Sequence, residues 1–185
     1  GLGAQCREAA LHTQLHARAI QKDFGFEAFA QAFRRHAAGV AVITALTPDG
    51  RPVGFTATSL TSLGTNPPLV SFNVAQGASF YATLQAGVRV NLHALGIRNL
   101  DLAIRLAGPR EARFPVGSWG TDEDGLPVFE NVTALLNCEI IQVVEVEKNA
   151  VVIAKALSGN AIQSDVPLLY HQRAFVAGGD ILKSN

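Results

Sequence analysis

The sequence is poor in cysteine and in charged side chains. Its 185 residues include only two cysteines, Cys6 and Cys138, and charged residues make up 16% of the chain. Two cysteines so far apart provide neither a disulfide framework nor the spacing of a metal site. Fifteen basic residues balance fifteen acidic ones without clustering, so the positive patch on which non-specific nucleic-acid binding depends is missing. We therefore expect a cytoplasmic protein that does not bind nucleic acid.

Long apolar runs and leader-like segments are also missing. No apolar stretch approaches the ~20 residues that a membrane-spanning helix needs, and residues 1–22 are too polar for a secretory signal. Hydrophobic residues nevertheless make up 48% of the chain, and the mean hydropathy is +0.21. This composition predicts one domain with a sizeable core and some apolar surface covered by a partner subunit.

Several catalytic and nucleotide-binding signatures are absent. The chain has no G-x-G-x-x-G turn and no G-x-x-x-x-G-K-[ST] loop, which excludes the usual Rossmann and P-loop sites. Gly117-Ser118-Trp119-Gly120 does not fit a serine nucleophile elbow. His12 and His16 stand four apart in a predicted helix, but without a third ligand nearby they are more simply solvated side chains. The other histidines are isolated, so we expect no metal site.

The hydrophobic pattern predicts short strands with a few inserted helices. Helices are expected over residues 5–22, 23–39, 79–86 and 99–107, with Asp23 capping the second and Ser79 the third. Strands are expected over residues 40–46, 51–59, 69–74, 88–92, 134–146, 150–157 and 174–176, and a long loop over 109–130. Because strand–helix alternation is not sustained, the pattern favours a closed antiparallel barrel with helical decoration over a doubly wound sheet.

A polar stretch begins inside the second predicted strand and runs on to residue 62. Within seven residues it carries five hydroxyl side chains, those of Thr56, Thr58, Ser59, Thr61 and Ser62. Hydroxyls and exposed backbone N–H groups suit a phosphate or an acceptor-rich ring edge, and the stretch holds no carboxylate or histidine to attack a ligand. On composition alone, a ligand site and an ordinary β-edge followed by a polar turn are equally good interpretations.

Further motifs stand in a characteristic order around this stretch. They are Ala38-Gly39-Val40, Asp49-Gly50, Pro67-Pro68-Leu69-Val70, Ser79, Val90-Asn91, Arg113-Phe114, Trp119, Cys138-Glu139 and Pro167-Leu168-Leu169-Tyr170. From about Phe26 to Phe175, the chain resembles the flavin reductase family, the reductase components of two-component flavin monooxygenases. The resemblance implies a mainly β fold, an antiparallel FMN-binding split β-barrel of Greek-key type with a few peripheral helices. It would form a single domain over residues 23–180, after an N-terminal helical extension over residues 1–22.

The resemblance also implies a flavin site. The isoalloxazine ring and ribityl chain would lie against Gly54, Phe55, Thr56, Ala57, Thr58, Ser59, Ser62, Asn73, Val74 and Ala75. Ser79 and Arg105 would take the phosphate, since a helix start and a guanidinium both favour phosphate oxygens. Asn149 and Phe175 would border the nicotinamide. Many family members carry a histidine where this chain has Asn149, and an asparagine side chain cannot carry charge.

The activity implied by the resemblance is NAD(P)H-dependent reduction of flavin, with hydride passing between the two cofactors and no catalytic side chain. FMN or FAD would be the flavin, and NADH or NADPH the donor. The 2′-phosphate of NADPH would need an extra cation, for which Arg110, Arg113 and Lys148 are candidates. The implied partners are a second copy of the chain, in a homodimer, and a flavin-dependent monooxygenase supplied with diffusible reduced flavin.

Two alternatives stay open. Because Asn149 replaces the usual histidine, the chain can be read as a flavin-binding electron carrier without its own nicotinamide site. The other alternative is a non-enzymatic split-barrel protein that binds a different planar cofactor, such as haem, or none.

Overall fold

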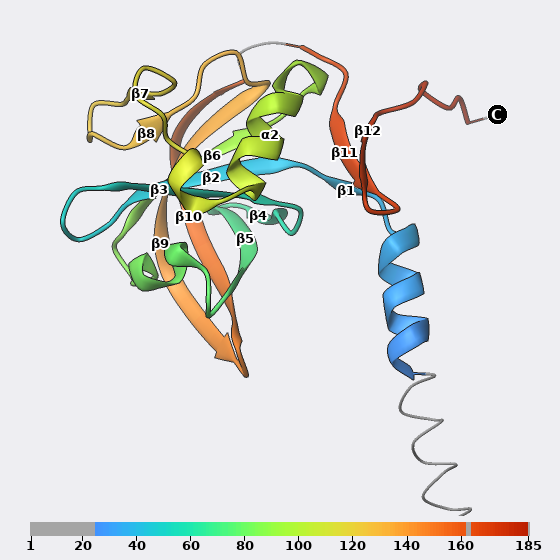
Figure 1. Cartoon of the computed structure of the whole chain (residues 1–185), viewed down its shortest axis with the longest axis horizontal. Coiled ribbons are helices and arrows are strands. Elements are labelled where there is room, and N and C mark those ends of the chain that lie inside the picture. The colour runs from blue at the N-terminus through green and yellow to red at the C-terminus, as the bar shows by residue number, and fades with distance from the viewer. Residues whose placement is uncertain (1–24, 162–163, 185) are drawn as a thin grey trace, which may run out of the picture. The chain divides into compact units, whose positions relative to one another are not determined.

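The computed structural model describes residues 25–161 and 164–184, whose contacts divide them into two compact units (Figure 1). One unit comprises residues 25–37 together with His171–Arg173, and the other comprises residues 38–161, 164–170 and 174–184. The helix predicted over 5–22, the capping role of Asp23, and the pair His12 and His16 lie outside the described residues. The domain boundary between residues 22 and 23 therefore stays a prediction.

The smaller unit is built on a helix over residues 25–35. Its phenylalanines recur at i, i+3 and i+7 and so share one face, where Phe26, Phe29 and Phe33 are 74%, 62% and 61% exposed. The Gln172 backbone N–H donates to the Arg34 carbonyl at 2.8 Å, which ties residues 171–173 to this helix. The helix ends at residue 35 and not near Gly39, where the sequence predicted its end.

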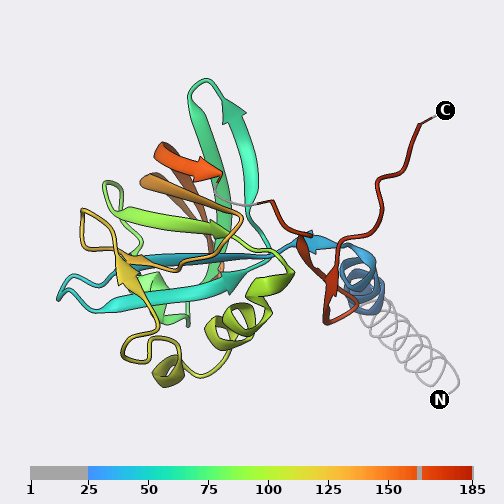
Figure 2. The same cartoon turned by 90° about the horizontal axis from the view of Figure 1, so that it is seen from above.

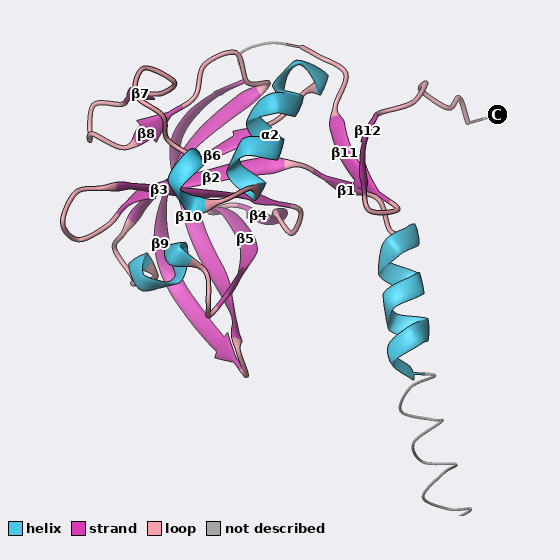
Figure 3. Cartoon of the chain, viewed as in Figure 1, coloured by secondary structure: helices cyan, strands magenta, loops and turns pink. Residues whose placement is uncertain are grey.

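The larger unit contains a seven-stranded antiparallel sheet in the order β3–β2–β6–β9–β10–β5–β4 (Figure 3). Its strands are β2 (Ala41–Leu46), β3 (Pro52–Ala57), β4 (Thr61–Thr65), β5 (Pro68–Ala75), β6 (Arg89–Ala94), β9 (Ala134–Val146) and β10 (Asn149–Ala161). The predicted mainly β, antiparallel fold is confirmed. The strand pattern alone predicted a closed barrel. In the described part of the chain, β3 and β4 are instead the two edge strands of the sheet and do not pair with each other.

Shorter elements complete this unit. A three-stranded sheet joins β1 (Ala38–Gly39), β11 (Leu168–His171) and β12 (Ala174–Ala177), and β7 (Gly120–Thr121) pairs with β8 (Pro127–Val128). The helical elements are the 3-10 helices η1 (Ser79–Thr83), η2 (Ile97–Asn99) and η3 (Arg110–Ala112) and the α-helix α2 (Leu100–Ala107). Figure 2 shows α2 on one side of the sheet, outside β2 and β3. The long predicted loop thus contains η3 and the β7–β8 hairpin.

Strand β2 contributes to two hydrophobic clusters, one on each of its faces. Ile43 packs with Phe72 and Phe80 in the first cluster, and Val42 packs with Leu106 in the second. Successive side chains of a strand point to opposite faces, so burial on both faces favours a nearly continuous apolar run, in which the one polar residue, Thr44, donates its hydroxyl to the Pro127 carbonyl. This explains why residues 40–46 read as a buried strand in the sequence.

Two elements around the polar stretch differ from the sequence prediction. The short helix predicted over residues 79–86 is present as a 3-10 helix over Ser79–Thr83, but Ser79 is its first residue and not its N-cap, and the preceding Ala78 makes no side-chain cap hydrogen bond. Thr61–Thr65 forms strand β4, which was not among the predicted strands. Four of its five residues are exposed, so it lacks the apolar alternation by which a half-buried strand is recognised.

Candidate functional site

The first part of the polar stretch, residues 56–59 at the end of β3 and in the turn that follows, lines a surface hollow of about 520 Å³, which we call the hydroxyl hollow. Its walls come from the end of β3, the end of β5, the start of η1 and the segment after α2. The lining residues are Phe55, Thr56, Ala57, Thr58, Ser59, Asn73, Val74, Ala75, Gly77, Ala78, Ser79, Gly108, Pro109, Arg110 and Arg113. The structure therefore brings together all of the residues predicted for the flavin except Gly54, Ser62 and Arg105.

Strand pairing explains how Asn73 reaches the polar stretch. The turn after β3 leads directly into β4, which pairs with β5 with Thr61 opposite Ser71. Ser59 precedes Thr61 by two residues, and Asn73 follows Ser71 by two. The Asn73 backbone N–H donates to the Ser59 hydroxyl oxygen at 2.9 Å. Because the Ser59 oxygen accepts this bond, its own proton remains available to a ligand in the hollow.

The hydroxyls of the stretch have different roles. The Thr56 hydroxyl donates to the Ala103 carbonyl at 2.6 Å and so fastens α2 to β3. Its proton is used inside the protein, although its oxygen can still accept a hydrogen bond. Thr58 is exposed and lines the hollow.

Two arginines form one end of the hydroxyl hollow. Arg113 donates from Nε to the Gly108 carbonyl at 3.0 Å and from a terminal guanidinium nitrogen to the Gly54 carbonyl at 2.9 Å. Burial, followed by the nearby charge of Arg110, lowers the pKa of Arg113, but a guanidinium remains protonated in proteins. Arg110 is exposed. The end of the hollow near Ser79 therefore carries two positive charges.

Gly54 lies beside a second hollow, of about 580 Å³, which we call the aromatic hollow because Phe114 and Tyr81 line it. A Cβ on Gly54 would stand 2.9 Å from the Ile43 carbonyl oxygen and 3.0 Å from the Phe114 ring. Glycine is therefore needed here so that Phe114 can pack on β3. The carbonyl of Gly54 accepts the Arg113 hydrogen bond.

Neither Ser62 nor Arg105 lines the hydroxyl hollow. Ser62 is exposed on β4. The guanidinium carbon of Arg105 lies 5.6 Å from the centre of the Phe129 ring, and Nε donates to the Arg113 carbonyl at 3.3 Å. Arg105 lines a separate hollow with Trp119, so its position gives no support to the predicted contact with phosphate.

The two residues predicted for the nicotinamide occupy different places. Asn149 pairs with Ala75 across β10 and β5, so it stands beside a residue that lines the hydroxyl hollow without being in the lining itself. Phe175 lies on β12, where its ring centroid is 5.3 Å from that of Tyr170, and it is not among the residues that line the hollow. Its predicted role stays a prediction.

Sequence reasoning did not place Arg110 and Arg113 among the residues around the flavin, although both line the hydroxyl hollow. It assigned the phosphate to Arg105 and considered these two arginines only for a nicotinamide 2′-phosphate. One signal was present, since Arg113-Phe114 was among the ordered motifs. The position of the Arg113 side chain depends on its hydrogen bonds to the carbonyls of Gly54 and Gly108. Gly54 is distant from Arg113 in sequence, and Gly108 lies across a turn.

Buried titratable groups elsewhere carry no charge. His93 is fully buried, and burial lowers its pKa to about 4. Nδ1 lies 3.0 Å from the Val42 carbonyl, while the Phe129 backbone N–H donates to Nε2 at 3.1 Å. A carbonyl only accepts, so Nδ1 carries the proton. Burial also raises the pKa of the Cys138 thiol to about 12.

Within residues 25–161 and 164–184, no group of three or more His, Cys, Asp or Glu side chains is arranged to hold a metal ion. In the same part of the chain, no helix has the length and apolar character needed to cross a membrane.

Comparison with known proteins identifies the class to which this fold and site belong. Residues 33–179 match the model of the flavin reductase like domain. NADH:FMN oxidoreductase of Rhodococcus erythropolis is 38% identical over 146 residues, which cover 76% of each chain. The crystal structure of a flavin reductase domain protein from Arthrobacter sp. FB24 is 35% identical, with a TM-score of 0.79 over 86% of this chain and 99% of that one.

A second solved structure extends the comparison. The styrene monooxygenase flavin reductase from Pseudomonas putida S12 is 26% identical, with a TM-score of 0.73 over 83% of this chain and 99% of that one. The chain belongs to the flavin reductase family.

Proposed function

We propose that this protein uses NAD(P)H to reduce FMN or FAD, and that the reduced flavin diffuses to a partner monooxygenase. The observation that carries the proposal is the chemistry of the hydroxyl hollow. Its walls offer hydroxyls and backbone groups. Among the described residues, Arg110 and Arg113 are the only charged ones that line it, and no carboxylate or histidine does. Such a site holds and orients a ligand but provides no acid or base.

The donor set of the hydroxyl hollow fits a flavin. Thr58, Ser59 and the backbone from Phe55 to Ala57 would meet the polar edge of the ring, opposite Val74 and Ala75. Ser79, Arg110 and Arg113 would hold the phosphate, because guanidinium groups bind phosphate oxygens strongly. The bound flavin supplies a ring that accepts hydride from the nicotinamide. The protein's part is to orient the ring, to exclude water and to neutralise the phosphate.

The proposed nicotinamide site centres on Asn149. Asn149, beside the lining of the hollow, has an amide that can both donate to and accept from a carboxamide. Because it cannot become charged, we propose that it positions the nicotinamide without taking part in proton transfer.

The test is anaerobic absorbance of the flavin band with purified protein, FMN and NADH. Protein-dependent bleaching at a rate well above that of free flavin is the expected result, and no bleaching would refute the proposal. Arg110→Glu should weaken the binding of FMN by about tenfold or more, since charged hydrogen bonds contribute about 1.5–3 kcal/mol, but should leave riboflavin, which lacks the phosphate, unchanged. Arg35→Glu, an exposed change in the other unit, is the matched control.

Asn149 favours one second candidate, a flavin-binding electron carrier without its own nicotinamide site. Bound flavin that stays oxidised with NADH and NADPH but is reduced by dithionite would support it. Asn149→His would then be expected to create NADH oxidation.

The proposal also includes a homodimer and a cytoplasmic location. Apolar side chains are exposed both on the helix of residues 25–35 and on α2, where Ile104 is 52% exposed, and a second copy of the chain would cover such surface. The buried free thiol of Cys138 suits a compartment in which thiols stay reduced.

A further inference from the structure

The aromatic hollow is not used by the function proposed above. It is at least as large as the hydroxyl hollow, at about 580 Å³ against about 520 Å³, and both volumes are typical of small-molecule sites. Its apolar walls include Pro52, Val53 and the rings of Phe114 and Tyr81. Planar apolar groups pack well against such walls.

The two hollows meet at a shared cationic wall. Ala78, Ser79, Arg110 and Arg113 line both of them. A phosphate held by this wall from the hydroxyl hollow therefore stands at the entrance of the aromatic hollow. Arg113 fixes the wall in place, since it is hydrogen-bonded to the carbonyls of Gly54 and Gly108 on either side.

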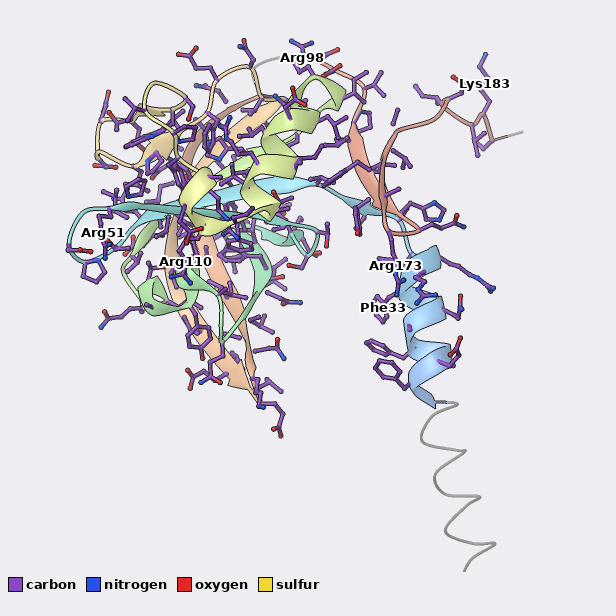
Figure 4. All side chains as sticks on the ribbon, viewed as in Figure 1. Phe33, Arg51, Arg98, Arg110, Arg173 and Lys183 are labelled. Atoms are coloured by element: carbon purple, nitrogen blue, oxygen red, sulfur yellow. The ribbon has the colours of Figure 1, made fainter. Side chains whose placement is uncertain are left out.

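A third arginine, Arg51, lines the aromatic hollow but not the hydroxyl hollow. Arg51 follows the β2–β3 turn and forms an ion pair with Asp49 at 2.8 Å. In Figure 4 the labelled side chains of Arg51 and Arg110 come from this turn and from the segment after α2. The aromatic hollow thus combines apolar walls for a ring with three arginines, of which Arg51 is paired with Asp49.

We propose that the aromatic hollow binds the adenosine monophosphate half of FAD, so that this protein binds FAD more tightly than FMN. The proposal rests on the proposed function, because it places the flavin ring of the same molecule in the hydroxyl hollow. FAD carries two phosphates between two ring systems, which matches two hollows joined at a cationic wall. FMN ends at its phosphate and would leave the aromatic hollow unused.

Ala82 offers a way to block only one hollow. It is exposed on η1 and lines the aromatic hollow but not the hydroxyl hollow. Ala82→Trp would place an indole where the adenine is proposed to lie. Ala86→Trp, at an exposed position in the turn that follows and outside both linings, is the matched control.

The experiment is isothermal titration calorimetry of the full chain with FMN and with FAD. We expect the native protein to bind FAD at least tenfold more tightly than FMN, and Ala82→Trp to remove this preference while changing FMN affinity less than twofold. Ala86→Trp should keep the preference. Arg51→Ala, which needs no space in the hollow, should weaken FAD binding several-fold and spare FMN.

Equal affinity for FMN and FAD in the native protein, or unchanged FAD binding in both Ala82→Trp and Arg51→Ala, would overturn the inference and leave the proposed function standing. Binding of neither flavin would overturn both. If Ala82→Trp raised the KM for NADH without weakening FAD, the hollow would belong to the nicotinamide dinucleotide, and the FAD proposal would be wrong.

Discussion

At the scale of single residues, Arg113 connects the two sides of the candidate site. Its two hydrogen bonds to carbonyls join β3 to the segment after α2, so the side chain shapes the hollow besides adding charge. The planar guanidinium can serve two acceptors at once from fixed directions, which a lysine ammonium cannot do in the same way. Arg113 is therefore a positioning residue whose replacement tests geometry separately from charge.

Arg113→Lys should weaken FMN binding by about tenfold even though the charge is kept, because hydrogen bonds from a charged group contribute about 1.5–3 kcal/mol each. Calorimetric titration measures the effect. Riboflavin affinity should fall as well, since the shape of the whole hollow changes. Arg110→Lys is the control, because Arg110 is exposed, and it should bind FMN nearly as well as the native protein. Equal behaviour of the two variants would show that Arg113 acts only through its charge.

His93 predicts a particular pH dependence of stability. Its pKa is lowered to about 4 in the folded protein, below the ordinary value of about 6.5, so folding favours the neutral ring. The free energy of unfolding should thus be highest above pH 6.5, fall as the pH drops from 6.5 to 4, and lose about 3 kcal/mol from this residue, at about 1.4 kcal/mol per pKa unit.

Urea unfolding measured between pH 7 and pH 4 checks this expectation. His93→Gln removes the titrating ring, and the fall in stability over this range should shrink by most of that amount. An unchanged pH profile in the variant would mean that His93 does not titrate as its burial requires.

At the scale of elements, we expect some hydroxyls of β3 and the turn after it to stabilise the fold and others to bind the flavin. Thr56 fastens α2 to β3 through Ala103, whereas Thr58 is exposed in the hydroxyl hollow. Thr56→Val should lower the free energy of unfolding by about 1 kcal/mol and change flavin affinity little. Thr58→Val should leave stability within about 0.5 kcal/mol and weaken flavin binding several-fold.

Thermal unfolding and flavin titration of the two variants together measure this difference. If Thr56→Val weakened flavin binding as much as Thr58→Val without loss of stability, the Ala103 hydrogen bond would not be the main role of Thr56.

The same scale shows what local pattern could predict. The strands β2, β9 and β10 were predictable because apolar residues run through them, and β9 has the predicted bounds. Strand β4 was missed because its side chains are mostly exposed, and its extended conformation comes from pairing with β5. The local hydrophobic pattern reflects which residues are buried, so a strand that is mostly exposed is difficult to recognise from it.

At the scale of the whole molecule, the exposed phenylalanines of the first helix are the clearest sign of a partner. Phe33 projects from this helix in Figure 4, and its ring centroid lies 4.8 Å from that of Phe29. The double variant Phe29→Ser and Phe33→Ser should convert the proposed homodimer to a monomer. Light scattering coupled to size-exclusion chromatography measures the mass.

Arg35→Ser, an exposed polar change on the same helix, is the control and should stay dimeric. A native protein that is monomeric at micromolar concentration would contradict the homodimer proposal directly.

The sequence by itself determined the strand-rich fold, the polar stretch that begins in β3 and the family, because burial of apolar residues and the order of motifs are written along the chain. The tertiary structure decided which arginines line the hydroxyl hollow. Arg105 has the right chemistry but lies against Phe129, while Arg113 reaches the hollow because its carbonyl partners fix it there. The physical reason is that the direction of a long side chain depends on acceptors contributed by distant parts of the chain, which no local pattern specifies.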